Sequence, residues 1–250
     1  MGLKLKGYAG SGTFAHGIHP PGHKNLSKDA TIRVMPTPDT VVLSLHQNIG
    51  GPCEPLVKTR QTVQWGEAIG KSSAFVSATL HASVSGIVQR PARMTLANGR
   101  HMDTLPIKSE GEMPSGRDLW EEIFGGDWPT TELDGYEPTL ISRAINDAGL
   151  VGLGGAAFPT HVKITPSDNK PIHTLIVNGC ECEPYLTSDY RLMVEAPAPI
   201  IAGALLAGRS VGARRIVIGV EDNKAPAIAA LKKAAVGTGI QVAVVRTKYP

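Results

Sequence analysis

The segment at residues 141–191 constrains this chain more than any other, because it combines a glycine-rich loop, a lysine, a short apolar run and a group of acidic residues. Its loop contains Gly152, Gly154 and Gly155, whose backbones can adopt φ values that other residues avoid. N–H groups in such a loop can point at one phosphate, and Lys163 beyond the loop can neutralise that phosphate as a point charge. The segment therefore predicts a phosphate-binding loop.

The glycine spacing matches the dinucleotide-binding fingerprint in form, but that fingerprint needs a strand before the loop and a helix directly after it. Residues 140–148, which precede the loop, place their apolar side chains at helical spacing. Pro159 follows the glycines closely and argues against an uninterrupted helix. The predicted order is a helix, the glycine loop and then extended chain, which disfavours an ordinary Rossmann turn.

The run at 173–178 is short and rich in β-branched residues, so it predicts a buried strand. Alternating elements follow it, with helices predicted at 200–211 and 226–235 and strands at 215–220 and 240–245. This order predicts a parallel sheet with right-handed crossovers. Ligands of open α/β sheets bind at the carboxyl edge, where the chain delivers Asn178, Glu181 and Glu183. An amide and two carboxylates suit a ligand rich in hydroxyl and ring N–H groups.

The sequence divides into four regions. These are an extended N-terminal arm at 1–40, a small all-β domain at 41–110, a linker with one or two helical turns at 111–136, and an α/β domain at 137–250. In the arm, His16, His19 and His23 offer either a metal site or, as the ordinary alternative, part of a Pro-rich arm packed over a neighbouring domain. In the all-β region, residues 77–86 resemble the barrel-sandwich of biotinyl and lipoyl domains. Since 81–86 contains no lysine, we expect this module to be structural rather than a carrier of a covalent cofactor.

Composition limits the possible classes of function. Hydrophobic residues make up 42% of the 250 residues, which supports a real core, and aromatic residues make up 5%, which disfavours a stacking platform for single-stranded nucleic acid. A net charge of +3 calls for neither nucleic acid nor anionic lipid as a partner. No apolar run approaches the roughly 18 residues of a membrane span, and the N-terminus lacks a signal-peptide core. Membrane association is therefore expected only through partner proteins.

The three cysteines, Cys53, Cys180 and Cys182, are too few for a disulfide scaffold and fit a cytoplasmic, reducing location. They also fall short of the four thiolates that a [4Fe–4S] cluster takes. Cys180 and Cys182 are separated by one residue, which suits neither an internal disulfide nor, without a second pair, a zinc site. We therefore expect no independent redox or metal role for this pair.

Two motifs, GLGGAAFPTHVK and VNGCECEPYLTSDYRLM, resemble the C subunit of the Rnf/Rsx ion-translocating electron transport complex. More distantly, they resemble the flavin-bearing, NADH-oxidising subunit of respiratory complex I, whose loop is also glycine-rich and followed by Phe-Pro-Thr. The stretches GIHPPGHKNLS and FVSATLHASVSGIV are similar to the same Rnf/Rsx subunit as well, so the resemblance covers nearly the whole chain. It implies an incomplete parallel-sheet FMN-binding α/β domain, like that of the complex I flavin subunit, preceded by the small all-β barrel-sandwich domain.

The resemblance also implies a site for FMN and NADH. The residues implied to bind FMN are Gly152, Gly154, Gly155, Ala156, Lys163, Asn178, Glu181, Cys182 and Glu221. Phe158 and Glu183 are implied to receive the nicotinamide nucleotide, and for Glu221 a solvated glutamate at a strand end is the alternative. The chain departs from the complex I pattern at Leu153, where that subunit carries Arg, and at Cys180, where it carries Asp. No residue is implied as catalytic or metal-binding, because the cofactors carry the chemistry.

The function implied is that of an electron-transfer subunit of a membrane-bound NADH:ferredoxin oxidoreductase. Such a subunit passes electrons from NADH through FMN toward iron–sulfur carriers, coupled to Na⁺ or H⁺ transport. Its partners are NADH and the other subunits of the complex, and its expected location is the cytoplasm or the cytoplasmic face of the inner membrane. The resemblance places the end of this sequence inside the flavin domain, before the family's cysteine runs for iron–sulfur clusters. Two alternatives stay open: a flavin-less docking or scaffold fragment of the complex, and a cobalamin reductase-type flavoprotein.

Overall fold

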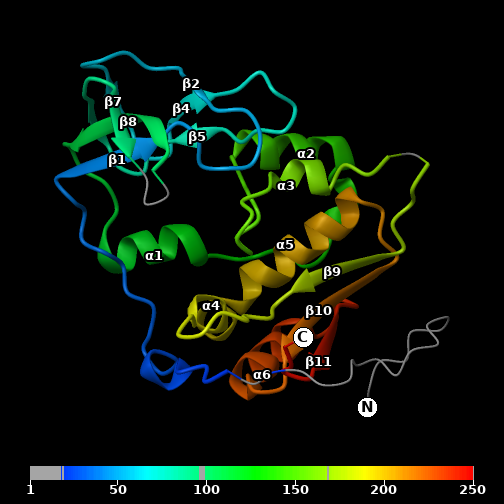
Figure 1. Cartoon of the computed structure of the whole chain (residues 1–250). Helices are drawn as coiled ribbons and strands as arrows, with labels where there is room; N and C mark the ends of the chain where they lie inside the picture. Colours follow the sequence, from blue (N-terminus) through cyan, green and yellow to red (C-terminus); the bar gives the residue numbers. More distant parts are fainter. Residues whose placement is uncertain (1–17, 19, 96–98, 168, 250) are drawn as a thin grey trace. The chain divides into compact units, whose positions relative to one another are not determined.

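The computed structural model describes residues 18, 20–95, 99–167 and 169–249 (Figure 1). The chain divides into two compact units. The β unit comprises Val34–Gly125 and Tyr136–Lys170, and the α/β unit comprises the described residues of Met1–Arg33, Gly126–Gly135 and Pro171–Pro250. The glycine loop thus lies in the β unit, and the described part of the N-terminal arm up to Arg33 lies in the α/β unit.

The β unit contains two antiparallel sheets made of short strands. The strands are β1 (Thr40–Ser44), β2 (Glu54–Pro55), β3 (Thr62–Val63), β4 (Ala68–Lys71), β5 (Leu80–His81), β6 (Gly86–Val88), β7 (Ala92–Thr95) and β8 (His101–Ser109). One sheet has the order β1-β8-β6-β3, with β7 paired to β8, and the other has the order β2-β4-β5. This arrangement confirms the predicted all-β barrel-sandwich fold.

The long strand β8 lies at the centre of the β unit, where it pairs with three strands. Leu105 and Ile107, two residues apart on β8, are almost completely buried, because alternate side chains of a strand point to the same face. Ile107 pairs with Val41 of β1 and with Val88 of β6. These apolar pairs, together with Ile69, build the core of the unit.

The described residues of the β unit form three helices: α1 (Gly116–Phe124), α2 (Pro138–Asp147) and α3 (Thr160–Lys163). The predicted helix before the glycine loop is confirmed as α2, so no strand precedes the loop and the ordinary Rossmann turn is excluded. The prediction of extended chain after the loop was wrong, because a single helical turn, α3, begins directly after Pro159. A proline is well tolerated at the start of a helix, where its missing N–H would have no partner within the helix.

The α/β unit is built on a three-stranded parallel sheet (Figure 1). Its strands are β9 (Thr174–Asn178), β10 (Arg215–Glu221) and β11 (Gln241–Val245), in the order β11-β10-β9. The helices between the strands are α4 (Ser188–Glu195), α5 (Pro197–Ser210) and α6 (Ala225–Ala234), and two short 3₁₀ turns lie at Lys24–Leu26 and Leu133–Gly135. The parallel sheet confirms the predicted α/β fold class, whereas α4 was not predicted.

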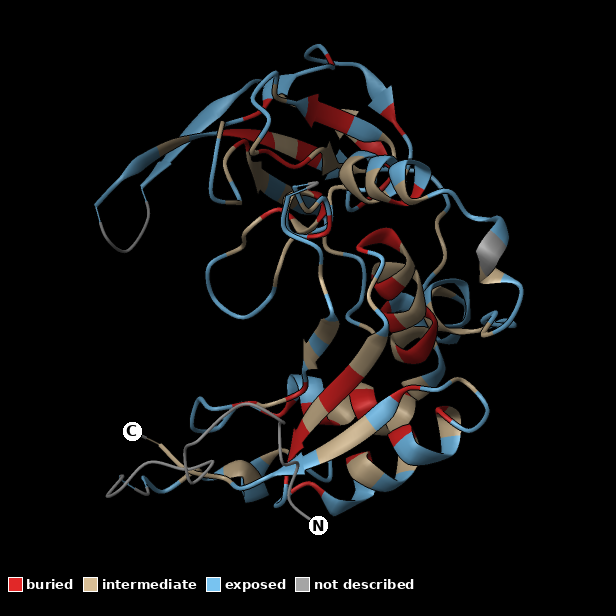
Figure 2. Ribbon diagram, turned by 90° about the vertical axis from the view of Figure 1, so that its right-hand side faces the viewer, coloured by how far each residue is buried: buried red, intermediate tan, exposed pale blue. Residues whose placement is uncertain are grey.

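One apolar cluster joins all three helices to the sheet of the α/β unit. Ile201 of α5, Leu231 of α6 and Val220 of β10 have no measurable exposure to solvent. Figure 2 shows the buried stretches of the helices and strands in red. Gly208 lets α5 approach β10, because a side chain there would collide with Ile216. The cluster holds the carboxyl ends of β9 and β10 at a common edge of the sheet.

Among the described residues, no single helix is long and apolar enough to cross a membrane. The pair α4 and α5 passes the same test of length and composition only when the two helices are taken together, and they are bent by 98° at the break between them.

Val220 and Val236 form a matched pair for testing the core of the α/β unit, since Val220 is fully buried and Val236 is 78% exposed. Val220→Ala removes two buried methyl groups and leaves a cavity, so we expect the free energy of unfolding to fall by about 2 kcal/mol. Val236→Ala should change it by less than about 0.5 kcal/mol. Urea-induced unfolding followed by circular dichroism measures both, and equal losses would contradict the assigned core.

Candidate functional site

The glycine loop of the β unit is closed at its base by backbone contacts. Val151 and Pro159 form an isolated antiparallel bridge, and the N–H of Gly152 donates to the carbonyl oxygen of Phe158 at 2.8 Å. The four residues 153–156 at the tip are exposed, so their backbone is available to a ligand. Gly155 has a φ of 103°, which other residues rarely adopt. The loop therefore has a fixed base and an open, glycine-dependent tip.

Lys163 at the end of α3 lies against this loop. A β-carbon built on Gly152 would stand 2.6 Å from the Nζ atom of Lys163, so the absence of a side chain at Gly152 leaves room for the ammonium. His161 on the same turn is buried and bonds through Nε2 to the carbonyl oxygen of Phe75 at 3.1 Å, which anchors α3. The structure thus brings together the loop and the lysine that the sequence analysis combined, and Phe158 lies half-buried beside them.

The carboxyl edge of the sheet in the α/β unit carries the other predicted residues. Asn178 ends β9, and its Oδ1 accepts the N–H of Cys180 at 3.0 Å. Glu181 is only 1% exposed, and its Oε1 accepts the N–H of Asp189 at the start of α4 at 2.9 Å. Glu221 ends β10, is 6% exposed and accepts the N–H of Glu181 at 3.0 Å. The alternative of a solvated glutamate at position 221 is therefore wrong.

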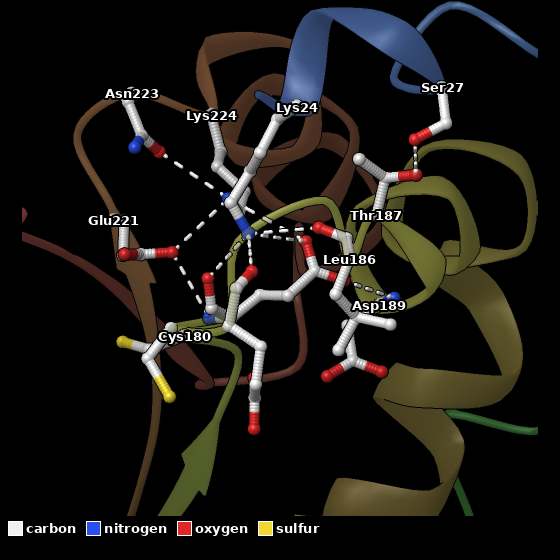
Figure 3. Close-up of polar contacts among 12 residues, drawn as sticks. Lys24, Ser27, Cys180, Leu186, Thr187, Asp189, Glu221, Asn223 and Lys224 are labelled. Atoms are coloured by element: carbon white, nitrogen blue, oxygen red, sulfur yellow. Dashed lines mark hydrogen bonds and ion pairs between the residues drawn. The ribbon is translucent and has the colours of Figure 1, made fainter. Parts of the chain in front are cut away.

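Two lysines compensate these buried carboxylates (Figure 3). The Nζ of Lys24, from the N-terminal arm, lies 3.5 Å from Oε2 of Glu181. The Nζ of Lys224 lies 3.7 Å from the same oxygen and 3.2 Å from Oε2 of Glu221. A buried charge needs such partners, because removal from water costs several kcal/mol. We name Lys24, Glu181, Glu221 and Lys224 the buried charge network.

Glu183 and Cys182, together with Asn178, present an exposed surface next to this network. The hydrogen bond from the thiol of Cys182 to the Glu183 carboxylate raises the pKa of Cys182. Burial, with the nearby Glu221 carboxylate, raises the pKa of Cys180. Both thiols are therefore protonated at neutral pH, which does not favour nucleophilic or metal-ligand chemistry. Among the described residues, no cluster of three histidine, cysteine or acidic side chains could hold a metal ion.

The glycine loop and the buried charge network belong to different compact units. Sequence reasoning missed Lys24 and Lys224. Lys224 stands three residues after Glu221, across the turn between β10 and α6, and only its nearness along the chain could have suggested an ion pair. For Lys24 the signal was its place in the GIHPPGHKNLS motif. His23 of the same motif stacks on Tyr185. The other two histidines of the candidate metal site, His16 and His19, lie outside the described residues.

A cavity of about 460 Å³ lies in the α/β unit beside the buried charge network. Its lining includes Lys24 of the arm, Thr187 before α4, Lys224 before α6, and Tyr249 near the C-terminus. Its volume falls within the range of small-molecule pockets, roughly 300–1,000 Å³. Small solutes can therefore reach the side chain of Lys24.

The raised pKa of Cys182 gives a pH-dependent test. The hydrogen bond with the Glu183 carboxylate is the main cause of the raised pKa of Cys182. Alkylation of Cys182 by iodoacetamide should therefore accelerate at a higher pH than alkylation of an ordinary exposed thiol, and Glu183→Gln should lower the pH at which the rate is half-maximal. Peptide mass spectrometry over a pH series measures each site, and buried Cys53 serves as the slow internal control. Identical pH profiles for Cys182 in the two proteins would show that Glu183 does not influence the thiol.

Comparison with known proteins matches both parts of the chain. Residues 145–250 match the family described as Nuo51 FMN-binding domain, and residues 12–112 match the RnfC barrel sandwich hybrid domain. A solved NAD⁺-reducing [NiFe]-hydrogenase is 26% identical to this chain. The match covers 51% of this chain and 24% of the hydrogenase chain, with a TM-score of 0.41.

Relatives of known name extend over nearly the whole sequence. The C subunit of the Na⁺-translocating ferredoxin:NAD⁺ oxidoreductase complex of Acetobacterium woodii is 39% identical over 96% of this chain and 52% of its own. The corresponding C subunit of the proton-translocating ferredoxin:NAD⁺ oxidoreductase complex of Clostridium ljungdahlii is 38% identical over 95% of this chain and 50% of its own. The chain thus spans about half the length of these relatives. Over this span it is similar to the C subunits of ion-translocating ferredoxin:NAD⁺ oxidoreductases, and it matches a barrel-sandwich hybrid domain followed by an FMN-binding domain.

Proposed function

We propose that this chain is the FMN-binding, NADH-oxidising part of an electron-transfer subunit in a Rnf-type complex. The names of its relatives, which are ferredoxin:NAD⁺ oxidoreductase subunits, support this proposal together with the match to an FMN-binding domain. The partners are then NADH and the other subunits of the complex. Membrane association occurs through those subunits at the cytoplasmic face, with electron flow coupled to Na⁺ or H⁺ transport.

The glycine loop is the observation that carries the proposal. Its exposed tip, its left-handed Gly155 and the adjacent Lys163 form a cradle that fits a phosphate group. The space at Gly152 is part of this fit, because any side chain there would displace the lysine ammonium. Backbone N–H groups and a lysine are the usual partners of a phosphate. The residues present therefore fit the phosphate end of FMN.

When bound, FMN accepts a hydride and releases single electrons, chemistry that no protein side chain supplies. The chain contributes binding and orientation. In the β unit, the loop amides at 153–156 and Lys163 are proposed to hold the phosphate, and Phe158 to contact the nicotinamide nucleotide. In the α/β unit, Asn178 and Cys182 are proposed to face a flavin, and Glu183 to orient a nicotinamide nucleotide. Glu181 and Glu221 are buried and ion-paired, so we assign them to shaping this edge of the sheet rather than to accepting hydrogen bonds from a ligand at their carboxylates.

Iron–sulfur clusters are proposed to be held by other parts of the complex, since the three cysteines of this sequence cannot supply the four thiolates of a [4Fe–4S] cluster. In this scheme the chain hands electrons to carriers outside itself.

The visible absorption spectrum tests the proposal. The purified chain, supplied with FMN and freed of excess, should retain flavin absorption that bleaches when NADH is added without oxygen. A colourless protein that takes up no FMN would support a docking or scaffold fragment instead. Bleaching coupled to reduction of a cobalamin but never of ferredoxin, when the chain is assayed with its partners, would support a cobalamin reductase-type flavoprotein.

Lys163 and Gly152 offer a sharper test of the phosphate cradle. Lys163→Gln removes a charge-assisted hydrogen bond, and Gly152→Ala pushes the ammonium aside, so each should weaken FMN binding roughly tenfold or more. Exposed Lys170→Gln is the matched control and should bind FMN as the parent does. Quenching of flavin fluorescence measures the dissociation constants. Unchanged binding in both variants would remove the loop from the FMN site even if the chain proves to be a flavoprotein.

A further inference from the structure

The turn at 179–187 depends on the N-terminal arm for its conformation. The ammonium of Lys24 donates to the carbonyl oxygens of Glu181 at 2.7 Å, Leu186 at 2.9 Å and Glu183 at 3.2 Å (Figure 3). Its fourth neighbour is Oε2 of Glu181 at 3.5 Å. A lysine ammonium has three N–H donors, so these contacts account for all of them. One side chain, more than 150 residues away in sequence, thus gathers three carbonyl groups of a single turn.

Further backbone groups of this turn are bonded to residues near the two ends of the chain. The hydroxyl of Tyr249 donates to the carbonyl oxygen of Cys182 at 2.8 Å. Tyr185 has a left-handed φ of 69°, its N–H donates to the carbonyl oxygen of Gly22 at 2.7 Å, and its ring stacks on His23. The turn contains no helix or strand that could maintain this shape alone.

Lys24 also has an electrostatic role in the same place. Its side chain is 17% exposed, while that of Glu181 is fully buried, and Lys224 and Lys24 share the same carboxylate oxygen. Loss of Lys24 would leave the buried charge network with one excess negative charge and three carbonyl groups without a donor. The excess negative charge disfavours the observed turn, because an unpaired buried charge is costly. The partly buried carbonyl oxygen of Glu181 also loses its donor, and the exposed carbonyl groups of Glu183 and Leu186 lose the common donor that holds them together.

We propose that Lys24 is a positioning residue that holds the 179–187 turn in the shape in which Cys182 faces the flavin and Glu183 orients the nicotinamide nucleotide. Lys24 acts through the turn and does not itself touch the ligand. The inference deepens the proposed function. Its first half, that Lys24 holds the turn, stands alone, and its second half, that the turn presents residues to the ligand, rests on the proposed function. In this proposal the N-terminal arm maintains the conformation of the turn and does more than cover the surface of the α/β unit.

Hydrogen exchange measured by NMR on the full chain tests the first half without any cofactor. In Lys24→Ala, the amides of Glu181, Tyr185 and Asp189, which are bonded within this arrangement, should exchange roughly tenfold faster or more, while amides of β10 keep the parent rates. Exposed Lys28→Ala, four residues along the same arm, is the matched control and should match the parent throughout. Loss of protection across the whole sheet would overturn the inference, since Lys24 would then be a general folding residue, and so would unchanged exchange in the turn.

Chemical rescue separates hydrogen bonding from charge. Because the cavity beside Lys24 admits small solutes, ethylammonium should restore slow exchange in Lys24→Ala. Tetramethylammonium carries the same charge without N–H donors and should not. Equal rescue by the two ions would show that charge compensation of Glu181 alone sets the turn, which overturns the positioning role.

Kinetics with NADH test the second half. In Lys24→Ala loaded with FMN, the KM for NADH should rise roughly tenfold with a smaller change in kcat, and ethylammonium should reverse the rise. An unchanged KM, with exchange in the turn accelerated, would show that the turn does not present the nucleotide site. If the parent chain takes up no FMN, the proposed function fails, whereas the exchange and rescue results still decide what Lys24 does.

Discussion

The buried charge network is the constraint on which the α/β unit depends. Two carboxylates and two ammonium groups meet at the carboxyl edge of the sheet, and each is 17% exposed or less. Ions removed from water are tolerated only when opposite charges and hydrogen bonds replace the water. The four residues come from the arm, from the turn after β9, from the end of β10 and from the turn between β10 and α6, so the network can form only when all these segments are in place. It therefore couples the arm to the sheet in a way that apolar packing, which is less directional, does not.

Much of the fold follows from local sequence patterns. The strands β9, β10 and β11 and the helices α5 and α6 were predicted because each is a continuous run with one periodicity. The strand β8 was not predicted, since Pro106 interrupts it and proline normally argues against a paired strand. Here the carbonyl oxygen of Pro106 still accepts the N–H of Gln89, and distant strands supply the rest of the pairing. Such pairing depends on tertiary structure, which no short window of sequence contains.

The candidate site was only partly predictable for a related reason. The sequence identified the residue types, namely the glycines with Lys163 and the acidic residues around the two strand ends. It did not reveal which carboxylates point inward. Glu181 and Glu183 are two residues apart in the same turn, yet Glu181 is buried against lysines and Glu183 is exposed. The buried carboxylate of Glu181 is bound by Lys24, Lys224 and the N–H of Asp189. Lys24 is separated from Glu181 by 157 residues, which leaves no periodicity to detect.

Exposed and buried carboxylates at this edge of the sheet should tolerate substitution differently. An exposed carboxylate such as Glu183 can change with little consequence for the fold, because water solvates whatever replaces it. An inward carboxylate such as Glu221 cannot change alone, because Lys224 would be left as an uncompensated buried charge. Substitutions at the inward positions therefore act first on the shape of the sheet edge, and any effect on a ligand is secondary. Recognition of the nucleotide can thus be tuned at the exposed positions of the turn while the buried charge network keeps the turn itself unchanged.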